Sequence, residues 1–598
     1  MVHRVAVVDL DNCHSRKCGL ECIKFCPVNK GGGKCVVLDE KGKAVISEEL
    51  CTGCGICVKK CPFKAITIVN LAEQLKEEKI HQFGANGYRL FRLPTPRKGA
   101  VVGLVGKNGV GKSTTIKILS GTLKPNLGFY ESPPEWDKII EAFKGTELKE
   151  YFEKIASKSL RVSVKPQAVY LLSRLWKGTG RELLKAYDER GVAATLVDSL
   201  NLKDALDKSV SDLSGGECQR LVIAVAASKD AEVYFFDEPS SYNDVFQRMA
   251  VAEVIRSLAS EGRAVVVAEH DLTLLDYLSD YIHILYGEPG VYGIVSKVQS
   301  SRTGINILLD GYIPEENIRF RERPIRFDIT APIEEVGAQY PIASYTKMVK
   351  KYPGFTLIVD EGEVKKGEVI GILGANAIGK STFLKMIAGV EQPDEGSLTI
   401  AAKISYKPQY LNSDVDGDVK TLLDKASNGK MESGLYQSQI ITPLGIPKLL
   451  DKQVRDLSGG ELQKVAIAAC LLQDADIYAL DEPSAFIDVE DRFVLAKAIN
   501  RFVKAEGKSA LIVDHDIQLI DIVSDRILIF TGNPGVEGRV SKALSKEEGM
   551  NLFLKSIGIT YRRDVESGRP RVNKPGSKLD RLQKSLGSYY YVSRGAAE

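Results

Sequence analysis

A set of short motifs occurs twice in this 598-residue chain, and this repeat limits the possible folds more than any other feature. The stretch GKNGVGKST begins at Gly106 and GANAIGKST at Gly374. The stretch LSGGE begins at Leu213 and again at Leu457, and in each copy the glutamate of a DEP motif lies 24 residues after the LSGGE serine. A repeat that keeps this spacing predicts two copies of one domain.

The two glycine-rich stretches each follow an apolar strand and precede a helix, which is the context of a phosphate-binding loop. Backbone amides of such a loop and the N-terminus of its helix form a cradle for anions. We expect Lys112 and Lys380 to reach the β- and γ-phosphates of ATP. Ser113 and Ser381 are expected to bind Mg²⁺ as well as ATP. The other expected ATP contacts in these loops are Gly106, Asn108, Gly109, Gly111, Thr114, Gly374, Asn376, Gly379 and Thr382.

Carboxylates follow the apolar strands in VYFFDEP and IYALDEP, at the strand end where α/β sheets place ligands. Asp237 and Asp481 are predicted to hold Mg²⁺ through water. Glu238 and Glu482 are predicted to be catalytic, by orienting or activating the water that attacks the γ-phosphate.

Histidine and glutamine also recur at equivalent positions. His270 and His515 follow apolar strands 32 and 33 residues after the DEP glutamates, and we predict that both contact the γ-phosphate as catalytic residues. Gln167 ends VKPQ and Gln409 ends YKPQ, and both are predicted to contact ATP and Mg²⁺. A single histidine after a strand is more often structural, and the repetition favours the catalytic interpretation.

The two phosphate loops differ at one position that affects backbone geometry. Ala377 occupies the place of Gly109. If this position needs a positive φ, alanine is strained there because its Cβ crowds the backbone. We therefore expect the second site to bind or turn over nucleotide differently from the first.

Cysteines are concentrated near the N-terminus, where nine of the 11 lie between Cys13 and Cys61. A disulfide scaffold needs an oxidising compartment, and the sequence shows no signal-peptide pattern, so metal ligation is favoured. CTGCGICVKKCP has the spacing of a bacterial ferredoxin run, whose fourth cysteine ligates the other cluster. The predicted [4Fe–4S] ligand sets are Cys13, Cys18, Cys22 and Cys61 for one cluster and Cys26, Cys51, Cys54 and Cys57 for the other.

Zinc is the alternative metal, and Cys35 has no role in the predicted scheme. Cys218 and Cys470 follow the two LSGGE motifs and are expected to be ordinary core residues.

The bulk composition is that of a water-soluble protein, with 44% hydrophobic and 27% charged residues and a net charge of +3. No apolar run approaches the roughly 20 residues that a membrane span needs, so a cytoplasmic location is expected. The last segment, from Val540 onward, has 12 Lys or Arg against 6 Asp or Glu. This basic segment is either a site for phosphate backbone or a solvated face.

The expected architecture is a ferredoxin-like α+β iron–sulfur domain followed by two α/β P-loop ATPase domains of ABC type. The first copy has about 26 extra residues before its glutamine, with the pattern of a helix–loop–helix insertion that is either decorative or a partner contact. The expected boundaries are 1–72 for the iron–sulfur domain, 73–300 for the first ATPase domain with its insertion at about 131–160, 301–335 for a hinge, 336–535 for the second ATPase domain and 536–598 for a C-terminal hinge and basic tail.

The complete motif set, over roughly residues 75 to 535, resembles the ABC ATPase family. This resemblance implies two cassettes that face head to tail, each nucleotide lying between the P-loop of one and the LSGGE signature of the other. The implied signature contacts with ATP are Ser214, Gly215, Gly216, Ser458, Gly459 and Gly460. Tyr88 and Tyr352 are expected either to stack on adenine or to pack in the core.

With the cysteine-rich domain included, nearly the whole chain resembles the ABC class E family, also called the RNase L inhibitor family of ribosome-recycling ATPases. The resemblance includes GINILLDGYIPEENIRFR and GRPRVNKPGSKLDRLQKSLGSYYY. It implies ATP-driven splitting of ribosomes after termination or stalling, with release-factor-like proteins. It also implies retention on the small subunit, which links recycling to initiation and its factors.

The resemblance further implies that the insertion and several arginines contact ribosomal RNA, namely Arg302, Arg319, Arg321, Arg323, Arg562, Arg563, Arg569 and Arg571. Asn243, Ala375 and Ala377 depart from the family pattern and bear on the kinetics of the sites. We expect ATP to close the cassettes and swing a rigid cluster domain. The alternatives are an ATP-gated iron–sulfur electron-transfer protein, although no flavin or nicotinamide motif is found, and the ATPase of a membrane transporter.

Overall fold

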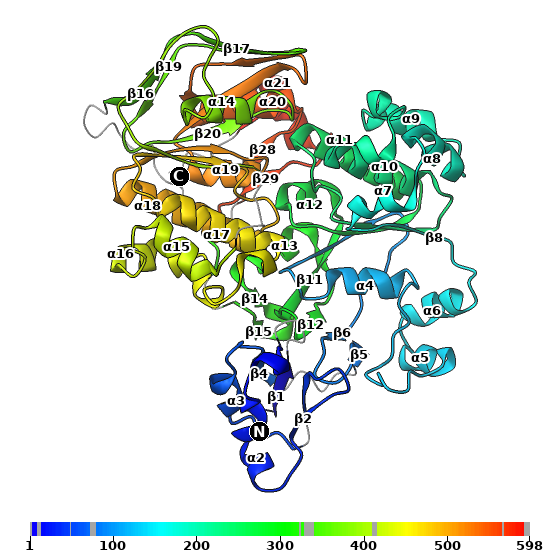
Figure 1. Cartoon of the computed structure of the whole chain (residues 1–598). Coiled ribbons are helices and arrows are strands. Elements are labelled where there is room, and N and C mark those ends of the chain that lie inside the picture. Colours follow the sequence, from blue (N-terminus) through cyan, green and yellow to red (C-terminus); the bar gives the residue numbers. More distant parts are fainter. Residues whose placement is uncertain are drawn as a thin grey trace, which may run out of the picture.

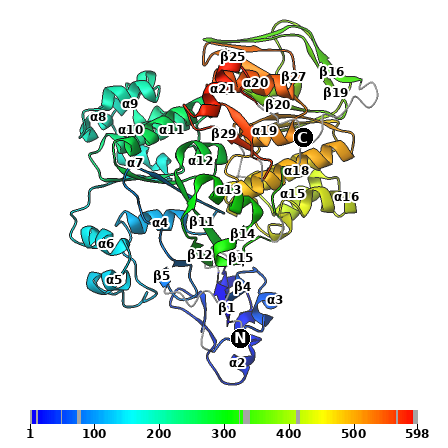
Figure 2. The same cartoon turned by 180° about the vertical axis from the view of Figure 1, so that it is seen from behind.

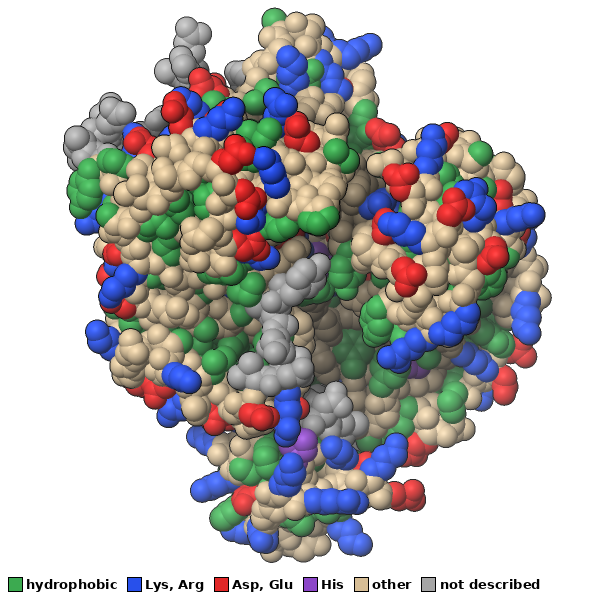
Figure 3. All heavy atoms as spheres, turned by 45° about the horizontal axis from the view of Figure 1, so that its top comes forward, with side chains coloured by type: hydrophobic (Ala, Val, Ile, Leu, Met, Phe, Trp, Pro, Cys, Tyr) green, Lys and Arg blue, Asp and Glu red, His purple; other side chains and the backbone are tan. Residues whose placement is uncertain are grey.

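The computed structural model describes residues 3–8, 13–47, 50–71, 79–321, 324–327, 340–409, 416–564 and 567–590. A small N-terminal domain lies at one end of the molecule, below two larger α/β cassettes that lie side by side (Figure 1). Figure 3 shows the cassettes as two lobes with a hollow between them, and Lys and Arg side chains gather over the lower end. In the described part of the chain, every helix is too short or too polar to cross a membrane.

The N-terminal domain combines two small antiparallel sheets with very short helices. One sheet pairs β1 with β4 and the other pairs β2 with β3. Its elements are β1 (His3–Val8), α1 (Glu21–Lys24), α2 (Pro27–Lys30), β2 (Val36–Leu38), β3 (Ala44–Ile46), α3 (Ile56–Lys60) and β4 (Ile66–Leu71). Five of its buried core residues are cysteines, so few aliphatic side chains support the fold. A domain this small needs additional stabilisation, which bound metal can provide.

The two cassettes contain nine-stranded sheets with the same strand order, which confirms the predicted pair of α/β domains. The first sheet runs β5 (Lys79–Gln82), β6 (Arg89–Phe91), β12 (Tyr292–Val295), β11 (Tyr281–Glu288), β7 (Val101–Gly106), β10 (Ala264–Ala268), β9 (Val233–Asp237) and β8 (Val162–Lys165), with β13 (Gln299–Ser300) beside β11. The second runs β17 (Met348–Tyr352), β18 (Phe355–Val359), β26 (Glu537–Val540), β25 (Arg526–Asn533), β20 (Val369–Leu373), β24 (Ser509–Val513), β23 (Ile477–Asp481) and β22 (Ile404–Lys407), with β27 (Leu544–Ser545) beside β25.

The five strands from β11 to β8, and likewise from β25 to β22, are parallel, so their carboxyl ends meet at one edge. The P-loop helices follow β7 and β20, and the helices α10 and α17 begin after the signature serines. Ser214 and Ser458 form capping boxes with the glutamates of LSGGE, which explains why a helix starts at this motif.

The main helices of the first cassette are α4 (Lys112–Leu119), α8 (Gly180–Tyr187), α9 (Ala193–Ser199), α10 (Gly215–Ser228), α11 (Val245–Ser260) and α12 (Leu272–Leu278). Those of the second are α14 (Lys380–Ile387), α15 (Val419–Ala426), α17 (Gly459–Leu471), α18 (Val489–Ala505) and α19 (Ile517–Val523).

The extra residues of the first cassette form two helices, α5 (Trp136–Ala142) and α6 (Leu148–Ala156), which project from its outer side (Figure 1). Ile139 and Phe152 are fully buried, and Phe143 stacks on Phe152 with ring centroids 4.7 Å apart. The insertion therefore packs on the cassette core. The second cassette has its own addition, a three-stranded antiparallel sheet of β16 (Pro341–Tyr345), β19 (Gly362–Lys365) and β21 (Leu398–Ile400).

The segment after the first cassette folds as α13 (Ser301–Asp310) and a small hairpin of β14 (Tyr312–Ile313) and β15 (Ile318–Arg319). In the region expected as a C-terminal tail, the described residues 536–564 and 567–590 are folded. β26 pairs with β25 across the expected boundary at residue 535, so the second cassette extends beyond it. The elements that follow are α20 (Lys546–Ser556), β28 (Tyr561–Arg563), β29 (Pro570–Val572) and α21 (Lys578–Leu586). The views from the front and the back place them between the cassettes (Figures 1 and 2).

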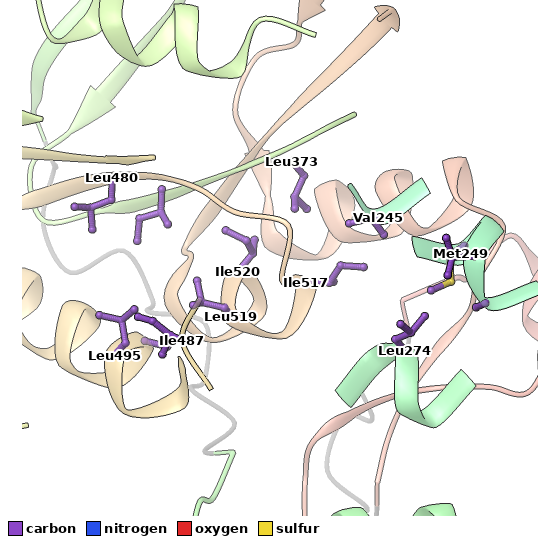
Figure 4. Close-up of a cluster of buried hydrophobic side chains, with 14 of the residues drawn as sticks. Val245, Met249, Leu274, Leu373, Leu480, Ile487, Leu495, Ile517, Leu519 and Ile520 are labelled. Carbon is purple, nitrogen blue, oxygen red and sulfur yellow. The ribbon is translucent and has the colours of Figure 1, made fainter. Parts of the chain in front are cut away.

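One large hydrophobic cluster contains residues of both cassettes. Figure 4 shows Val245, Met249 and Leu274 of the first cassette beside Ile517 and Ile520 of the second. Burial of apolar side chains across this boundary contributes roughly 25 cal/mol for each Å² removed from water. The cassettes therefore meet through a packed core.

Candidate nucleotide sites and cysteine clusters

Both P-loops have the geometry of an anion cradle. Gly111 and Gly379 precede the helices with φ values of 96° and 97°, which favour glycine. The Lys112 Nζ donates hydrogen bonds of 2.8 Å to the carbonyls of Gly106 and Lys107, so the lysine folds back over its own loop. Lys380 does the same in the second cassette. Burial lowers the pKa of Lys112 to about 8, although the nearby Glu238 carboxylate opposes this shift.

The expected strain in the second P-loop is present. Ala377 has a φ of 55°, whereas Gly109 has 78°. The backbone carbonyls of both residues accept hydrogen bonds, from the Gly535 amide at 2.8 Å and the Gly290 amide at 3.0 Å. The surrounding loops therefore hold both residues in a left-handed conformation, which costs a non-glycine residue roughly 1–2 kcal/mol.

The two aspartates at the ends of β9 and β23 fit a divalent cation. Asp237 and Asp481 are buried, and the Oδ1 atom of each lies without a hydrogen-bond partner among the described residues. Burial raises the pKa of both carboxyl groups, and the nearby Ser113 and Ser381 hydroxyls act in the opposite direction. A buried carboxylate oxygen with no donor is suited to a cation or its bound water.

Glu238, the glutamate predicted to be catalytic in the first cassette, has the neighbours that its repeat position predicts. The Gln167 Nε2 donates to the Glu238 Oε1 at 2.8 Å, and the His270 Nε2 lies 3.5 Å from the same oxygen. Burial acts to raise the pKa of Glu238, but His270 and Lys112 outweigh it and lower the pKa to about 2. The carboxylate is therefore charged at neutral pH.

The second cassette repeats this arrangement with slightly shorter distances. The Gln409 Nε2 donates to the Glu482 Oε1 at 2.6 Å, and the His515 Nε2 lies 3.2 Å from it. Glu238 and Glu482 have positive φ values of 49° and 47°. Strained backbone at matched positions of two sites is typical of functional residues.

Each P-loop also contacts the other cassette. The Asn108 amide donates to the Asp488 Oδ2 at 3.4 Å, and the Asn376 amide donates to the Asp244 Oδ2 at 2.6 Å. The cassettes therefore lie head to tail. The residues recorded at these contacts are the two aspartates rather than the signature serines, and sequence reasoning did not name them. Their signal was the position shortly after each DEP motif, at the start of α11 and α18.

An open pocket at the first P-loop collects most of the residues expected there. Its lining includes Asn108, Gly109, Gly111, Lys112, Ser113, Thr114, Gln167 and Glu238. Tyr88 also lines the pocket, and its hydroxyl donates to the Val110 carbonyl at 2.7 Å. Phe83 lines it as well and is 46% exposed. Phe83 is therefore the freer ring for stacking, and its signal was an aromatic residue before the glycines of QFGANGY.

In the second cassette, Tyr352 is held at the end of β17. Its hydroxyl donates a short hydrogen bond to the carboxylate of Glu391. The ring is 37% exposed, so one face is free for a ligand. Phe355 pairs with Tyr352 across the β17–β18 turn and lies close to Gly379 of the P-loop.

The cysteines of the N-terminal domain form two groups. Cys26, Cys51, Cys54 and Cys57 line one cavity. In the other group, burial raises the pKa of Cys22 to about 11, with Cys61, Cys13 and Cys18 contributing to the shift. Cys61, the last cysteine of CTGCGICVKKCP, therefore lies with Cys13, Cys18 and Cys22. Cys26, which follows those three in the sequence, lies with Cys51, Cys54 and Cys57.

Cys35 is a ninth thiol that the spacing did not assign. It lines the cavity of the second group, and burial together with Cys26 and Cys51 raises its pKa to about 12. Among the described residues no three His, Cys, Asp or Glu side chains are arranged to hold a metal ion. A single zinc would need four such ligands within about 2.3 Å of it. A [4Fe–4S] cluster takes one cysteine at each iron, so a group of four thiols matches the number of ligands that it needs.

Comparison with known proteins assigns both parts of the chain. Residues 95–241 and 360–485 match the family described as ABC transporter. Residues 3–34 match a possible Fer4-like domain in RNase L inhibitor, RLI, and residues 44–67 match a 4Fe-4S binding domain. The translation initiation factor RLI1 of Chaetomium thermophilum is 45% identical, over 99% of this chain and 98% of the relative.

The chain belongs to the RNase L inhibitor, or ABC class E, family. A structure of ribosome-bound archaeal Pelota and ABCE1 matches with a TM-score of 0.91 and 52% identity, covering 99% of this chain and all of the known one. An archaeal ribosome recycling factor, aABCE1, in complex with the ribosomal stalk protein aP1 matches with a TM-score of 0.83 and 50% identity, covering 87% of this chain and all of the known one. This member of the family is an ATPase with two ABC domains and a 4Fe-4S binding domain.

Several arginines that the family resemblance assigned to ribosomal RNA are engaged within the chain. Arg569 is fully buried and pairs with Asp276, and Arg571 is also buried and reaches Asp276 at 3.3 Å. Arg321 forms a short ion pair with Glu490. The assignment is therefore wrong for Arg569 and Arg571, which are shielded from any partner.

Other members of that set have different surroundings. Arg563 pairs with Asp521, and Arg302 pairs with Asp564 while remaining partly exposed. Arg319 is exposed and lies over the Tyr312 ring. Arg323 lies outside the described residues. Arg319 is therefore the member of the set best placed to meet an external phosphate.

Proposed function

We propose that this chain is a ribosome-recycling ATPase that splits ribosomes into subunits after termination or stalling and then remains on the small subunit. The observation that carries the proposal is its likeness, over 99% of its length, to ABCE1 in the ribosome-bound structure with Pelota. Release-factor-like proteins are the proposed partners in splitting, because Pelota is bound in that structure. Initiation factors are further partners, since the relative RLI1 is a translation initiation factor. A cytoplasmic location is proposed with these partners, because they act on ribosomes.

Hydrolysis takes place at two sites between the cassettes. In the first, Lys112 and the loop amides bind the phosphates, and Glu238 accepts the proton of the attacking water. Gln167 and His270 hold the Glu238 carboxylate in position. Ser113 and Asp237 are the residues that would hold Mg²⁺, which supplies charge neutralisation at the phosphates. Lys380, Ser381, Gln409, Asp481, Glu482 and His515 have the same roles in the second site.

The N-terminal domain would hold two [4Fe–4S] clusters, on Cys13, Cys18, Cys22 and Cys61 and on Cys26, Cys51, Cys54 and Cys57. The grouping of these thiols supports this assignment. Bound clusters supply covalent cross-links, which stiffen a domain with few aliphatic core residues. We assign them a mechanical role and expect no electron transfer in recycling.

A short loop connects the first nucleotide pocket with the cluster domain. Phe83 and Tyr88, at its two ends, line the pocket. Between them, the Asn86 side chain accepts a hydrogen bond of 2.7 Å from the Ile46 amide and donates one of 2.8 Å to the Ile46 carbonyl. Ile46 lines the cavity of the second cysteine group. Movement of the first cassette is therefore transmitted to the cluster domain through this loop.

The test is sedimentation of archaeal or eukaryotic ribosomes with this chain, Pelota and either ATP or a non-hydrolysable analogue. Splitting should require nucleotide, and the analogue should leave the chain on the small subunit. Glu238→Gln with Glu482→Gln should give the same trapped complex with ATP. Release of this double variant in the presence of ATP would contradict the proposal.

A variant without two ligands of the second cluster, Cys54→Ser with Cys57→Ser, separates the mechanical role from electron transfer. The mechanical role predicts that nucleotide binding persists while splitting is lost, because the domain no longer transmits force. Splitting at the unaltered rate would exclude that role. Turnover that follows the cluster redox state and ignores ribosomes would favour the electron-transfer alternative.

A further inference from the structure

Two buried lysines lie behind the glutamates, at the second position of the VKPQ and YKPQ motifs, and have been given no role above. We propose that Lys165 and Lys407 are positioning residues that hold the Glu238 and Glu482 backbone in its strained conformation and thereby aim the two carboxylates. This inference rests on the proposed catalytic role of the glutamates and adds the residues that keep them in place.

Lys165 is the last residue of β8, the strand beside β9, and its side chain is fully buried. Its Nζ donates hydrogen bonds of 2.6 Å to the Asp237 carbonyl and 3.1 Å to the Glu238 carbonyl. The lysine therefore binds the main chain at the point where β9 ends and the catalytic carboxylate begins. Among the described residues its Nζ donates hydrogen bonds to these two carbonyls and none to the P-loop, so its effect on the reaction passes through the glutamate.

The second cassette repeats the arrangement independently. Lys407 ends β22, is 2% exposed, and donates to the Asp481 carbonyl at 2.6 Å and the Glu482 carbonyl at 3.4 Å. The two cassettes differ at many positions, including their additions and their P-loops. The same contact in both indicates a requirement of the site rather than an accident of packing.

The backbone at these glutamates needs external support. Left-handed φ values cost a non-glycine residue roughly 1–2 kcal/mol. Pro239 and Pro483 follow the glutamates, and a residue before proline is restricted toward extended conformations. A strained conformation of this kind persists only where neighbouring groups over-determine it.

Three donor–acceptor contacts fix the Glu238 peptide group. Its amide donates to the Ala268 carbonyl at 2.9 Å, and its carbonyl accepts from Lys165 and from the Gln219 Nε2, the latter at 2.6 Å. Gln219 lies on α10, the helix that begins at the signature. The Glu238 carbonyl thus links β8, through Lys165, to the signature helix, through Gln219. Gln463 and Lys407 make the equivalent pair of contacts with the Glu482 carbonyl.

A positive charge is retained here although burial acts against it and lowers the pKa of Lys165 to about 8. A buried ammonium group is costly unless it is paired, and a methionine of similar length would fill the same space without that cost. The carboxylates of Asp237 and Glu269 lie close enough to stabilise the Lys165 charge. The lysine therefore donates two hydrogen bonds, to the carbonyls of Asp237 and Glu238, that an apolar residue could not supply.

The test is steady-state ATP hydrolysis by the cluster-loaded chain carrying Lys165→Met, in a background where Glu482→Gln silences the second site. We expect kcat to fall at least tenfold, because small displacements of a reacting group are expensive. The KM for ATP should stay within about twofold of the background, because the substitution removes no contact with bound ATP. Lys407→Met in a Glu238→Gln background provides the same measurement for the second site.

Ser163→Ala is the matched control, because Ser163 is buried in the same strand and its hydroxyl donates to the Ala226 carbonyl, away from Glu238. It should leave kcat within about twofold of the background. Adding Glu238→Gln removes the carboxylate, and Lys165→Met should then cause no further loss of residual turnover. An equal loss with and without Glu238, or a KM effect with kcat unchanged, would overturn the proposal. Hydrolysis that survives both Glu→Gln substitutions would instead refute the catalytic glutamates themselves.

Discussion

Arg569 and Asp276 form an ion pair in which both side chains are fully buried. Arg569 precedes β29 in the C-terminal segment, and Asp276 lies on α12 of the first cassette. The Tyr561 and Thr273 hydroxyls lie 3.1 Å apart at the same boundary. The C-terminal segment is continuous in sequence with the second cassette. The pair therefore attaches the C-terminal end of the second cassette to the first cassette.

Asp276→Ala should lower the free energy of unfolding of the cassettes by about 3–5 kcal/mol, because it leaves Arg569 buried and unpaired. Urea denaturation followed by tryptophan fluorescence and circular dichroism measures the loss. Glu361→Ala is the control, since Glu361 pairs with Lys542 on the exposed surface, where solvent screens the pair, and should have a much smaller effect. Equal effects of the two substitutions would show that the buried pair contributes no more to the free energy of unfolding than the exposed pair.

Asn86→Ala should loosen the contact between the first cassette and the cluster domain. The Ile46 amide donates to the Asn86 side chain, so its hydrogen exchange should accelerate by at least tenfold while exchange in β7 stays unchanged. Mass spectrometry of peptides covering both strands measures this. Lys64→Ala is a comparison variant, because Lys64 forms an exposed contact with Asp451 of the second cassette. An unchanged Ile46 peptide in Asn86→Ala would contradict the coupling path.

The two P-loops should respond in opposite directions to exchange of glycine and alanine. Gly109→Ala places a Cβ at positive φ within 3.3 Å of Gly290 and Pro289, and should cost about 1–2 kcal/mol of stability. Ala377→Gly relieves the strain in the folded state but increases the conformational entropy of the unfolded chain. The net effect should be a rise of about 0–1 kcal/mol in the free energy of unfolding. Thermal unfolding with and without ATP measures both. Destabilisation by Ala377→Gly as large as that by Gly109→Ala would show that Ala377 is unstrained.

Phe83→Ala should raise the KM for ATP at the first site about tenfold, because base–aromatic stacking contributes about 1–3 kcal/mol. Tyr88→Phe removes only the hydroxyl bond to Val110 and should change KM less than threefold. ATP titrations of hydrolysis in a Glu482→Gln background compare the two. An unchanged KM in Phe83→Ala would contradict the assignment of the adenine contact to Phe83.

His270 makes the first site sensitive to acid. Burial and the Lys112 charge lower the pKa of His270 to about 4, against 6.5 for an exposed histidine. Between these values the unfolded chain binds more protons, so stability falls as the pH is lowered. His270→Gln should remove about 2–3 kcal/mol of the loss in unfolding free energy between pH 7 and pH 4.5, measured by urea denaturation. The same pH dependence in the variant would assign it to other groups.

Sequence reasoning identified every repeated motif of the nucleotide sites because local backbone geometry requires these residues at fixed spacing. Glycines appear where the P-loop needs positive φ, and a serine with a glutamate three residues later starts each signature helix. It also anticipated the strain at Ala377. It missed Phe83 and the aspartates Asp244 and Asp488, whose partners lie far away in the chain.

The arginines show the limit of a pattern based on charge. Arg569 and Arg571 occur in a basic segment that was interpreted as a possible RNA contact, yet they are buried against Asp276, which lies nearly 300 residues earlier. A charged residue next to others in sequence has no preferred location until the tertiary structure supplies its partner. The C-terminal segment is therefore part of the hinge.

By itself, the sequence determined the two cassettes, their phosphate chemistry and the cysteine-rich domain, because each depends on contacts between residues close in the chain. Only the tertiary structure decided how the cassettes face one another, which ring is exposed in the first pocket, and that Lys165 and Lys407 contact the backbone of Glu238 and Glu482. These features depend on pairs separated by tens to hundreds of residues. Such pairs have no local spacing, since folding of the whole chain brings them together.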